Sequence, residues 1–188
     1  MRKVESRRAR QGVMALAVLA LSGCGSSGGS GGSSSNTAPC PRIALLAEGA
    51  ELTRYRPGAP RDLTQMTFDA EIVGFDARCD YASRDRSALE VRVTPRFSAE
   101  RGPAADGRTV ELPWFVAVSD AGDTELLNRV ASSTRLTFTA NVNRTAGTGS
   151  SVTLTLPLGE RRAADYAVRI AFQLTQDELA QNRTRGLR

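Results

Sequence analysis

Apolar and polar residues alternate along most of the chain from residue 39 onwards. In the clearest segment, Tyr166, Val168, Ile170, Phe172 and Leu174 alternate with small or polar residues. A period of two places successive side chains on opposite faces, which is typical of half-buried β-strands. The pattern predicts seven to nine short strands, which fall within residues 43–47, 51–55, 66–79, 89–97, 110–118, 125–131, 136–142, 152–158 and 166–174.

Several local features modify or separate these strands. Within residues 66–79 the alternation changes phase beside Gly74, which predicts a β-bulge. Pro95 and Pro113 lack the N–H that a ladder needs, so we expect Pro95 at an edge or a bulge and Pro113 at an edge or a kink. Residues 119–123 and 145–151 have turn composition. Thr175-Gln176-Asp177-Glu178 matches a capping box and predicts a short helix over residues 177–181.

Short strands at roughly ten-residue spacing, with no long helical period between them, predict an all-β fold. We expect a single antiparallel two-sheet sandwich over residues 39–182, then a disordered tail at 183–188; a small barrel is the alternative. The sandwich could resemble the immunoglobulin or fibronectin type, because Tyr166 resembles the tyrosine position of such domains. Trp114 does not lie between Cys40 and Cys79, so the cysteine–tryptophan–cysteine order of antibody domains is missing.

The first 23 residues form a predicted signal peptide. A basic segment precedes an apolar run at residues 12–21, which is too short for a bilayer core that needs about 20 residues. The string Leu21-Ser22-Gly23-Cys24 resembles the lipobox of bacterial lipoproteins. The resemblance implies that the Cys24 thiol carries diacylglycerol, that the bond before it is cut and that the new amino terminus is acylated. The alternative is an ordinary signal peptide with a chance cysteine.

The residues after Cys24 fit a membrane tether. Residues 25–35 are all Gly or Ser, so residues 24–38 are predicted to be a flexible linker. By resemblance to proteobacterial lipoproteins, Gly25 rather than aspartate implies the outer membrane, with the domain facing the periplasm, over the inner membrane. Four segments, Cys40-Pro41-Arg42-Ile43-Ala44, Arg61-Asp62-Leu63-Thr64, Asp165-Tyr166-Ala167-Val168 and Phe172-Gln173-Leu174-Thr175, are similar to uncharacterised alphaproteobacterial lipoproteins. That resemblance covers most of the mature chain and implies no activity.

Removing the signal peptide changes the charge balance. The chain holds 25 basic and 20 acidic residues, and residues 1–23 contain five of the former and one of the latter. The rest is therefore close to neutral, with no basic stripe to indicate a nucleic-acid partner. Cys40 and Cys79 remain as an even pair in an oxidising compartment, which favours a disulfide over a redox pair or metal site. Such a bond contributes about 4 kcal/mol through chain entropy.

Few residues point to catalysis. The chain has no histidine, and it lacks a G-x-S-x-G elbow, a phosphate-binding loop and a dinucleotide fingerprint. Asp120, Asp123 and Glu125 offer oxygen ligands for Ca²⁺, although their irregular spacing favours a polar turn. We therefore predict no enzyme, no cofactor and no metal. Trp114 and Phe115 are adjacent in one strand, so one ring enters the core and the other is a candidate contact for a sugar or a protein.

Together these features predict a non-enzymatic structural or protein-interaction module that is presented to another protein of the cell envelope. The alternative is a module that binds peptidoglycan, lipopolysaccharide or carbohydrate, which would need several arginines in one concavity beside Trp114 or Phe115. A hydrolase with two close carboxylates is the third hypothesis.

Overall fold

The computed structural model describes residues 37–186, which form nine strands and one α-helix. The predictions about residues 1–36 and 187–188, including the lipidation of Cys24, lie outside the described residues. The strands are β1 (Arg42–Leu45), β2 (Glu51–Tyr55), β3 (Met66–Tyr81), β4 (Ala88–Arg101), β5 (Thr109–Asp120), β6 (Leu126–Thr137), β7 (Arg144–Thr148), β8 (Val152–Pro157) and β9 (Tyr166–Phe172), and the helix is α1 (Gln176–Arg185). Short 3-10 turns occupy Ala47–Gly49, Leu63–Gln65 and Ala163–Asp165.

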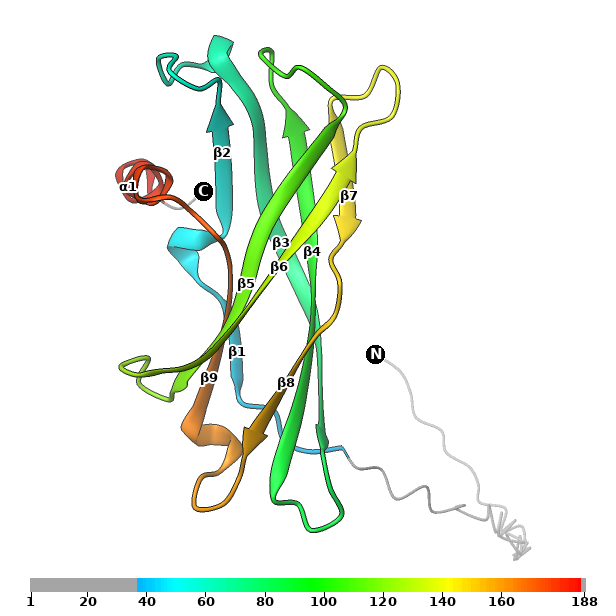
Figure 1. The fold of residues 1–188 in the computed structure, drawn as a ribbon, viewed down its shortest axis with the longest axis vertical. Helices are drawn as coiled ribbons and strands as arrows, with labels where there is room; N and C mark the ends of the chain where they lie inside the picture. Colours follow the sequence, from blue (N-terminus) through cyan, green and yellow to red (C-terminus); the bar gives the residue numbers. More distant parts are fainter. Residues whose placement is uncertain (1–36, 187–188) are drawn as a thin grey trace, which may run out of the picture. The chain divides into compact units, whose positions relative to one another are not determined.

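Two sheets form a mostly β, sandwich-like fold (Figure 1). The four-stranded sheet has the order β1-β9-β5-β6. The five-stranded sheet has the order β2-β3-β4, and β7 and β8 then pair with successive parts of β4. The predicted arrangement of two sheets with one short C-terminal helix is confirmed.

One strand pair departs from the predicted antiparallel arrangement. β1 pairs in parallel with β9, and Ile43 lies opposite Val168. The other strand pairs of residues 37–186 are antiparallel. The disulfide between Cys40 and Cys79 holds the segment before β1 at the last residues of β3. From there β1 starts beside the start of β9, with Arg42 opposite Ala167, and both strands run in the same direction. The prediction of a wholly antiparallel sandwich is therefore wrong at this edge.

The inward-facing side chains of both sheets build one apolar core. Trp114 is fully buried, and its ring centroid lies 5.9 Å from that of Phe97, which lies 5.7 Å from that of Phe172. The indole Nε1 of Trp114 donates a hydrogen bond to Thr134 Oγ1 at 2.9 Å, so its polar atom is satisfied inside the core. Each large apolar side chain buried here contributes about 1.5–3 kcal/mol.

The bulge predicted beside Gly74 is confirmed. The register between β3 and β4 shifts between Ile72 and Gly74, and the extra residue, Val73, is exposed. Of the alternatives predicted for the two prolines, the edge is excluded, because β4 and β5 both have neighbours on each side. Pro95 instead lies where β7 gives way to β8, and Pro113 lies just beyond the last β9 pairing, so neither interrupts a ladder.

Residues 136–148 differ most from the prediction. The strand expected at 136–142 does not exist separately, because Leu136 belongs to the end of β6 and residues 138–143 connect it to β7. The turn expected at 145–151 begins with β7. β7 contains no large apolar residue, and Gly147 packs against Leu136, where an added Cβ would lie 2.5 Å from Cδ2. The sequence therefore gives no alternation there.

The capping box is confirmed. The Thr175 hydroxyl accepts from the Glu178 N–H at 3.2 Å, and the Glu178 carboxylate accepts from the Thr175 N–H at 2.7 Å. The helix continues to Arg185, so residues 183–185 are helical rather than part of a disordered tail. Arg183 bonds to Glu48 in the turn before β2 and Arg185 bonds to Thr53 in β2, which holds this last stretch in place.

Candidate functional site

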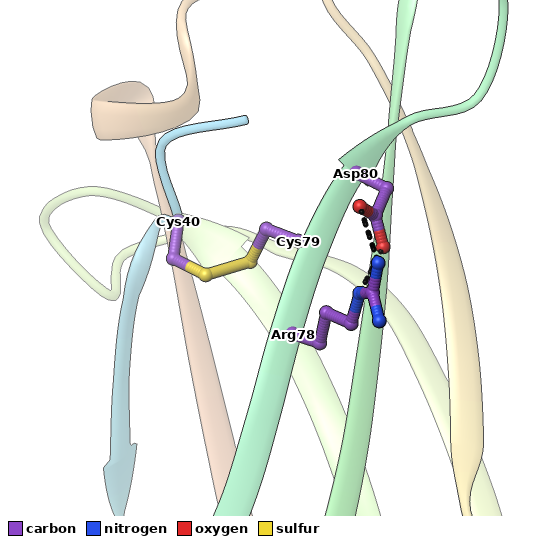
Figure 2. The surroundings of a disulfide bond; sticks show 4 residues. All are labelled: Cys40, Arg78, Cys79 and Asp80. Atoms are coloured by element: carbon purple, nitrogen blue, oxygen red, sulfur yellow. Dashed lines mark hydrogen bonds and ion pairs between the residues drawn. A yellow bond between two sulfur atoms is a disulfide. The ribbon is translucent and has the colours of Figure 1, made fainter. Parts of the chain in front are cut away.

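The disulfide closes one flank of the sandwich. Cys40 and Cys79 are bonded, as predicted, with their Cα atoms 5.4 Å apart. Figure 2 shows Cys79 pointing from β3 towards Cys40, whereas Arg78 and Asp80 point to the other face and form an ion pair. Just upstream, the Ala38 N–H donates to the Cys79 carbonyl at 2.9 Å. The bond therefore ties the segment that leads into β1 to the opposite sheet.

The same flank is covered further along by α1, which lies beside β2 (Figure 1). Asn182 Nδ2 donates to the carbonyls of Glu48 and Glu51 at 2.9 and 2.8 Å. Arg185 forms an ion pair with Glu51 at 2.9 Å, and Arg54 forms one with Glu178 at 3.1 Å. The helix thereby satisfies polar groups along the outer edge of β2.

The opposite flank, formed by β6 and β8, is open over part of its length. At one end β6 contacts β7, and the Thr145 hydroxyl donates to the Thr137 carbonyl at 3.2 Å. Towards the other end a cavity of about 480 Å³ lies between the sheets. Its lining includes the core residues Val118, Leu156 and Tyr166, together with Leu127, Asn128, Thr155, Pro157, Gly159, Glu160 and Arg161. Leu126, the first residue of β6, is 64% exposed. We call this region the open flank.

The backbone of β6 presents unpaired groups to the open flank. The Phe138 N–H donates to the Arg108 carbonyl, so Phe138 and Arg108 are a hydrogen-bonded pair. Every second residue of β6 from Phe138 backwards, which means the even-numbered residues, therefore bonds to β5. In an antiparallel pair the alternate residues point their N–H and C=O groups away from the partner strand. The residues that direct these groups to the free edge are therefore Arg129, Ala131, Ser133 and Arg135.

The edge of β8 is blunted by comparison. The Leu158 N–H donates to the Ser87 carbonyl, so the even-numbered residues of β8 bond to β4. The backbone N–H and C=O groups of the alternate residues, Thr153, Thr155 and Pro157, point away from β4. Pro157 has no N–H, and its carbonyl accepts the Tyr166 hydroxyl at 2.5 Å. In the described part of the chain β3 is also unpaired on its outer side over residues 73–78, between its last bond to β2 and the disulfide, but β6 alone has its free edge beside the cavity.

Trp114 and Phe115 have different positions. Trp114 is fully buried, so it is the ring that enters the core, and Phe115 remains as the candidate contact. Phe115 lies half-buried on the outer face, where the Arg129 guanidinium stacks 4.1 Å from the ring centroid. Phe115 and Arg129 therefore form one patch beside the β6 edge.

The acidic residues at 120–125 hold a turn together. Hydrogen bonds from the Glu125 N–H and the Thr124 hydroxyl lower the pKa of Asp120 to about 2. A hydrogen bond from Ser119, assisted by Arg169, lowers the pKa of Asp123. Among residues 37–186 no group of three or more His, Cys, Asp or Glu side chains is placed to hold a metal ion. The Ca²⁺ alternative thus has no support from this loop.

Arginines do gather in one concavity, which the sequence did not reveal. Arg54, Arg56 and Arg61 line a cavity of about 320 Å³ beside the start of α1. Each one is paired with a carboxylate, of Glu178, Asp106 and Asp177 respectively. An anionic ligand would have to displace these carboxylates, and Trp114 and Phe115 do not line this cavity.

No helix within residues 37–186 is both long and apolar enough to cross a membrane. Comparison of the chain with protein-family models, with curated proteins and with solved structures finds no match.

Proposed function

We propose that the protein is a cell-envelope lipoprotein, anchored in the outer membrane through Cys24, whose β-domain is a non-enzymatic module that binds another envelope protein. The observation that supports binding is the open flank, where a free strand edge adjoins an apolar cavity of about 480 Å³. Apolar clefts and free edges are regular binding surfaces for polypeptides. The signal peptide, lipobox and Gly/Ser linker support the anchor.

We also propose that the sandwich is related in architecture to the immunoglobulin and fibronectin type. The Tyr166 hydroxyl donates to the carbonyl of Pro157, nine residues upstream, across the connection between β8 and β9. This contact is similar to the tyrosine corner of those domains, in which a tyrosine at a strand start bonds to upstream backbone.

Photo-crosslinking in intact cells tests the binding role. A photoreactive residue at Asn128 on the open flank should capture one envelope protein reproducibly. The matched control places the same residue at Arg183, on the flank covered by α1, and should capture none. Equal capture at both positions would contradict the proposal. Recovery of only peptidoglycan or lipopolysaccharide would instead favour the ligand-binding alternative and the cavity of Arg54, Arg56 and Arg61.

Membrane fractionation tests the anchor separately. Cys24→Ala removes the acylated thiol, so the protein should leave the membrane fraction, because no lipid chain remains to hold it. Persistence of the variant in the outer-membrane fraction after a salt wash would contradict lipid anchoring.

A further inference from the structure

The outer edges of the two sheets differ in how they are protected. β3 extends beyond β2 and is unpaired on that side over residues 73–78, up to the disulfide at Cys79. The β2 edge is covered by α1, and β1 has only four residues. The edge made of β7 and β8 is interrupted at residues 149–151 and ends in Pro157. β6 has 12 residues, contains no proline, and no described helix or strand pairs with its outer edge over Arg129–Arg135. A long free edge of this kind is a template for another strand.

The side chains of β6 add a charge preference. The strand holds Arg129 and Arg135 and no acidic residue. Both arginines are exposed on the outer face, six positions apart. Glu111 lies opposite Arg135 on β5, but its carboxylate accepts the Ser133 hydroxyl, and Arg135 forms no ion pair among the described residues. The outer face of this edge is thus positively charged.

The charges disfavour a second copy of this chain as the occupant. Antiparallel pairing of two β6 strands about Ser132 would place Arg129 of each opposite Arg135 of the other. Like charges that face each other across strands are destabilising, whereas opposite charges stabilise the pair. In the register that matches two β6 strands over Arg129–Arg135, an acidic partner strand meets both arginines with opposite charge and a second β6 does not.

The inner side of the edge adds an apolar preference. An added strand would turn alternate side chains towards the gap between the sheets. There the cavity of about 480 Å³ is lined by Val118, Leu156 and Tyr166, and the half-buried Leu127 lies at its edge. Val118, Leu156 and Tyr166 are already buried, so large apolar side chains of a partner would cover the half-buried Leu127 and extend the core at this point.

From these observations we infer that the β6 edge binds an extended segment of another protein as an additional strand, in which acidic residues face Arg129 and Arg135 and the alternate residues are apolar. The inference rests on the proposed function and specifies the partner class of its open flank. The partner segment would bond to the backbone of Arg129, Ala131, Ser133 and Arg135, and its side-chain pattern would decide specificity.

Binding of two synthetic nonapeptides to the detergent-purified full-length protein tests the inference by fluorescence anisotropy. The first peptide alternates glutamate with valine or leucine, and the second has lysine in place of each glutamate. We expect the acidic peptide to bind at least about tenfold more tightly at low salt, with the difference falling as salt is added. The double variant Arg129→Glu, Arg135→Glu should reverse the preference.

Two substitutions at one position test strand addition itself. Ala131→Pro removes an N–H that faces the free edge and leaves the β5 ladder intact, so acidic-peptide binding should weaken about tenfold. Ala131→Ser keeps the N–H and should bind like the wild type. Circular dichroism checks that both variants are folded; if the proline variant is not, the charge-reversal variant decides.

Several results would overturn the inference. These are equal affinity for the two peptides, no binding of the acidic peptide at millimolar concentration, or unchanged binding by a folded Ala131→Pro variant. Sedimentation showing a dimer that Ala131→Pro dissociates would make a second copy the occupant and would also overturn it. If peptide binding fails while crosslinking at Asn128 persists, the interaction role stands and only strand addition is lost.

Discussion

The two flanks of the sandwich end their sheets in opposite ways. On one flank, α1 bonds to the outer edge of β2, and the bond between Cys40 and Cys79 ties the sheets together beneath it. On the other flank, β6 contacts β7 at one end, and towards the other end β6 and β8 lie on either side of an apolar cavity. The first flank contains a helix, a covalent bond and several ion pairs, and the second contains none of these between β6 and β8.

This difference indicates that one flank of the domain stabilises the fold and that the other leaves a strand edge free for binding. Free sheet edges are a hazard that proteins usually cover, charge or shorten. Here the β2 edge is covered, the β8 edge is interrupted, and the β6 edge is left long with two arginines on it. Variants on the closed flank should therefore change stability, whereas variants on the outer edge of β6 should change binding.

The largest effect is expected at the disulfide. Cys40→Ser or Cys79→Ser opens a loop with a sequence separation of 39 residues, and each should lower the free energy of unfolding by about 4 kcal/mol. Urea denaturation of the oxidised wild type and both variants measures it. The two losses should be similar because each variant breaks the same bond; a loss in one variant only would count against this role.

The next effect is expected where α1 meets β2. Asn182→Ala leaves the carbonyls of Glu48 and Glu51 without their side-chain donor and should cost about 1–2 kcal/mol in urea denaturation. The neighbouring Arg183→Ala removes only an exposed ion pair with Glu48, so it should cost less than about 1 kcal/mol. Equal losses would mean that the helix is held by its charges.

A smaller effect is expected where the open flank closes at its β7 end. Gly147→Ala places a Cβ 2.5 Å from Leu136 Cδ2, so the buried Leu136 side chain must shift, at a cost of about 1 kcal/mol. Gly107→Ala is the control, since an added Cβ there meets nothing within 4 Å. Thermal unfolding compares the two variants, and an unchanged melting temperature for Gly147→Ala would show that this contact is loose.

The smallest effect is expected in the turn that leads into β6, and it depends on pH. The pKa of Asp120 is about 2 in the folded protein, below its ordinary value of 3.8. The ionised carboxylate therefore contributes fully to the stability of the fold above pH 3.8, and this contribution is lost as the pH falls towards 2. Asp120→Asn should destabilise the protein at pH 7, and its difference from the wild type should shrink between pH 4 and pH 2. Urea midpoints across this range measure the trend; a constant difference would contradict it.

Much of the fold could be predicted because its determinants are local. Strand alternation, the phase change beside Gly74 and the Thr175–Glu178 capping box are all written within a few neighbouring residues. The pairing of Cys40 with Cys79 followed from their being the last two thiols. β7 escaped prediction because its Gly147 packs against Leu136 from another strand, a contact that no local pattern contains.

The candidate site was harder to predict because it depends on what remains unpaired. Which edges are free follows from the order of strands in each sheet, and that order is fixed by contacts between distant segments. The alternation placed Trp114 and Phe115 on opposite faces but did not say which ring was buried. The exposure of β6 likewise could not be inferred from its own residues.

The parallel pairing of β1 with β9 bears on how the chain is delivered before it folds. A chain that emerges from its N-terminus first, from a ribosome or a transport channel, releases Ile43 long before Val168, its partner across the sheet. β1 therefore waits for nearly the whole domain, and contacts of such long sequence separation slow folding. The four-stranded sheet therefore cannot be completed before its last strand, β9, has been delivered.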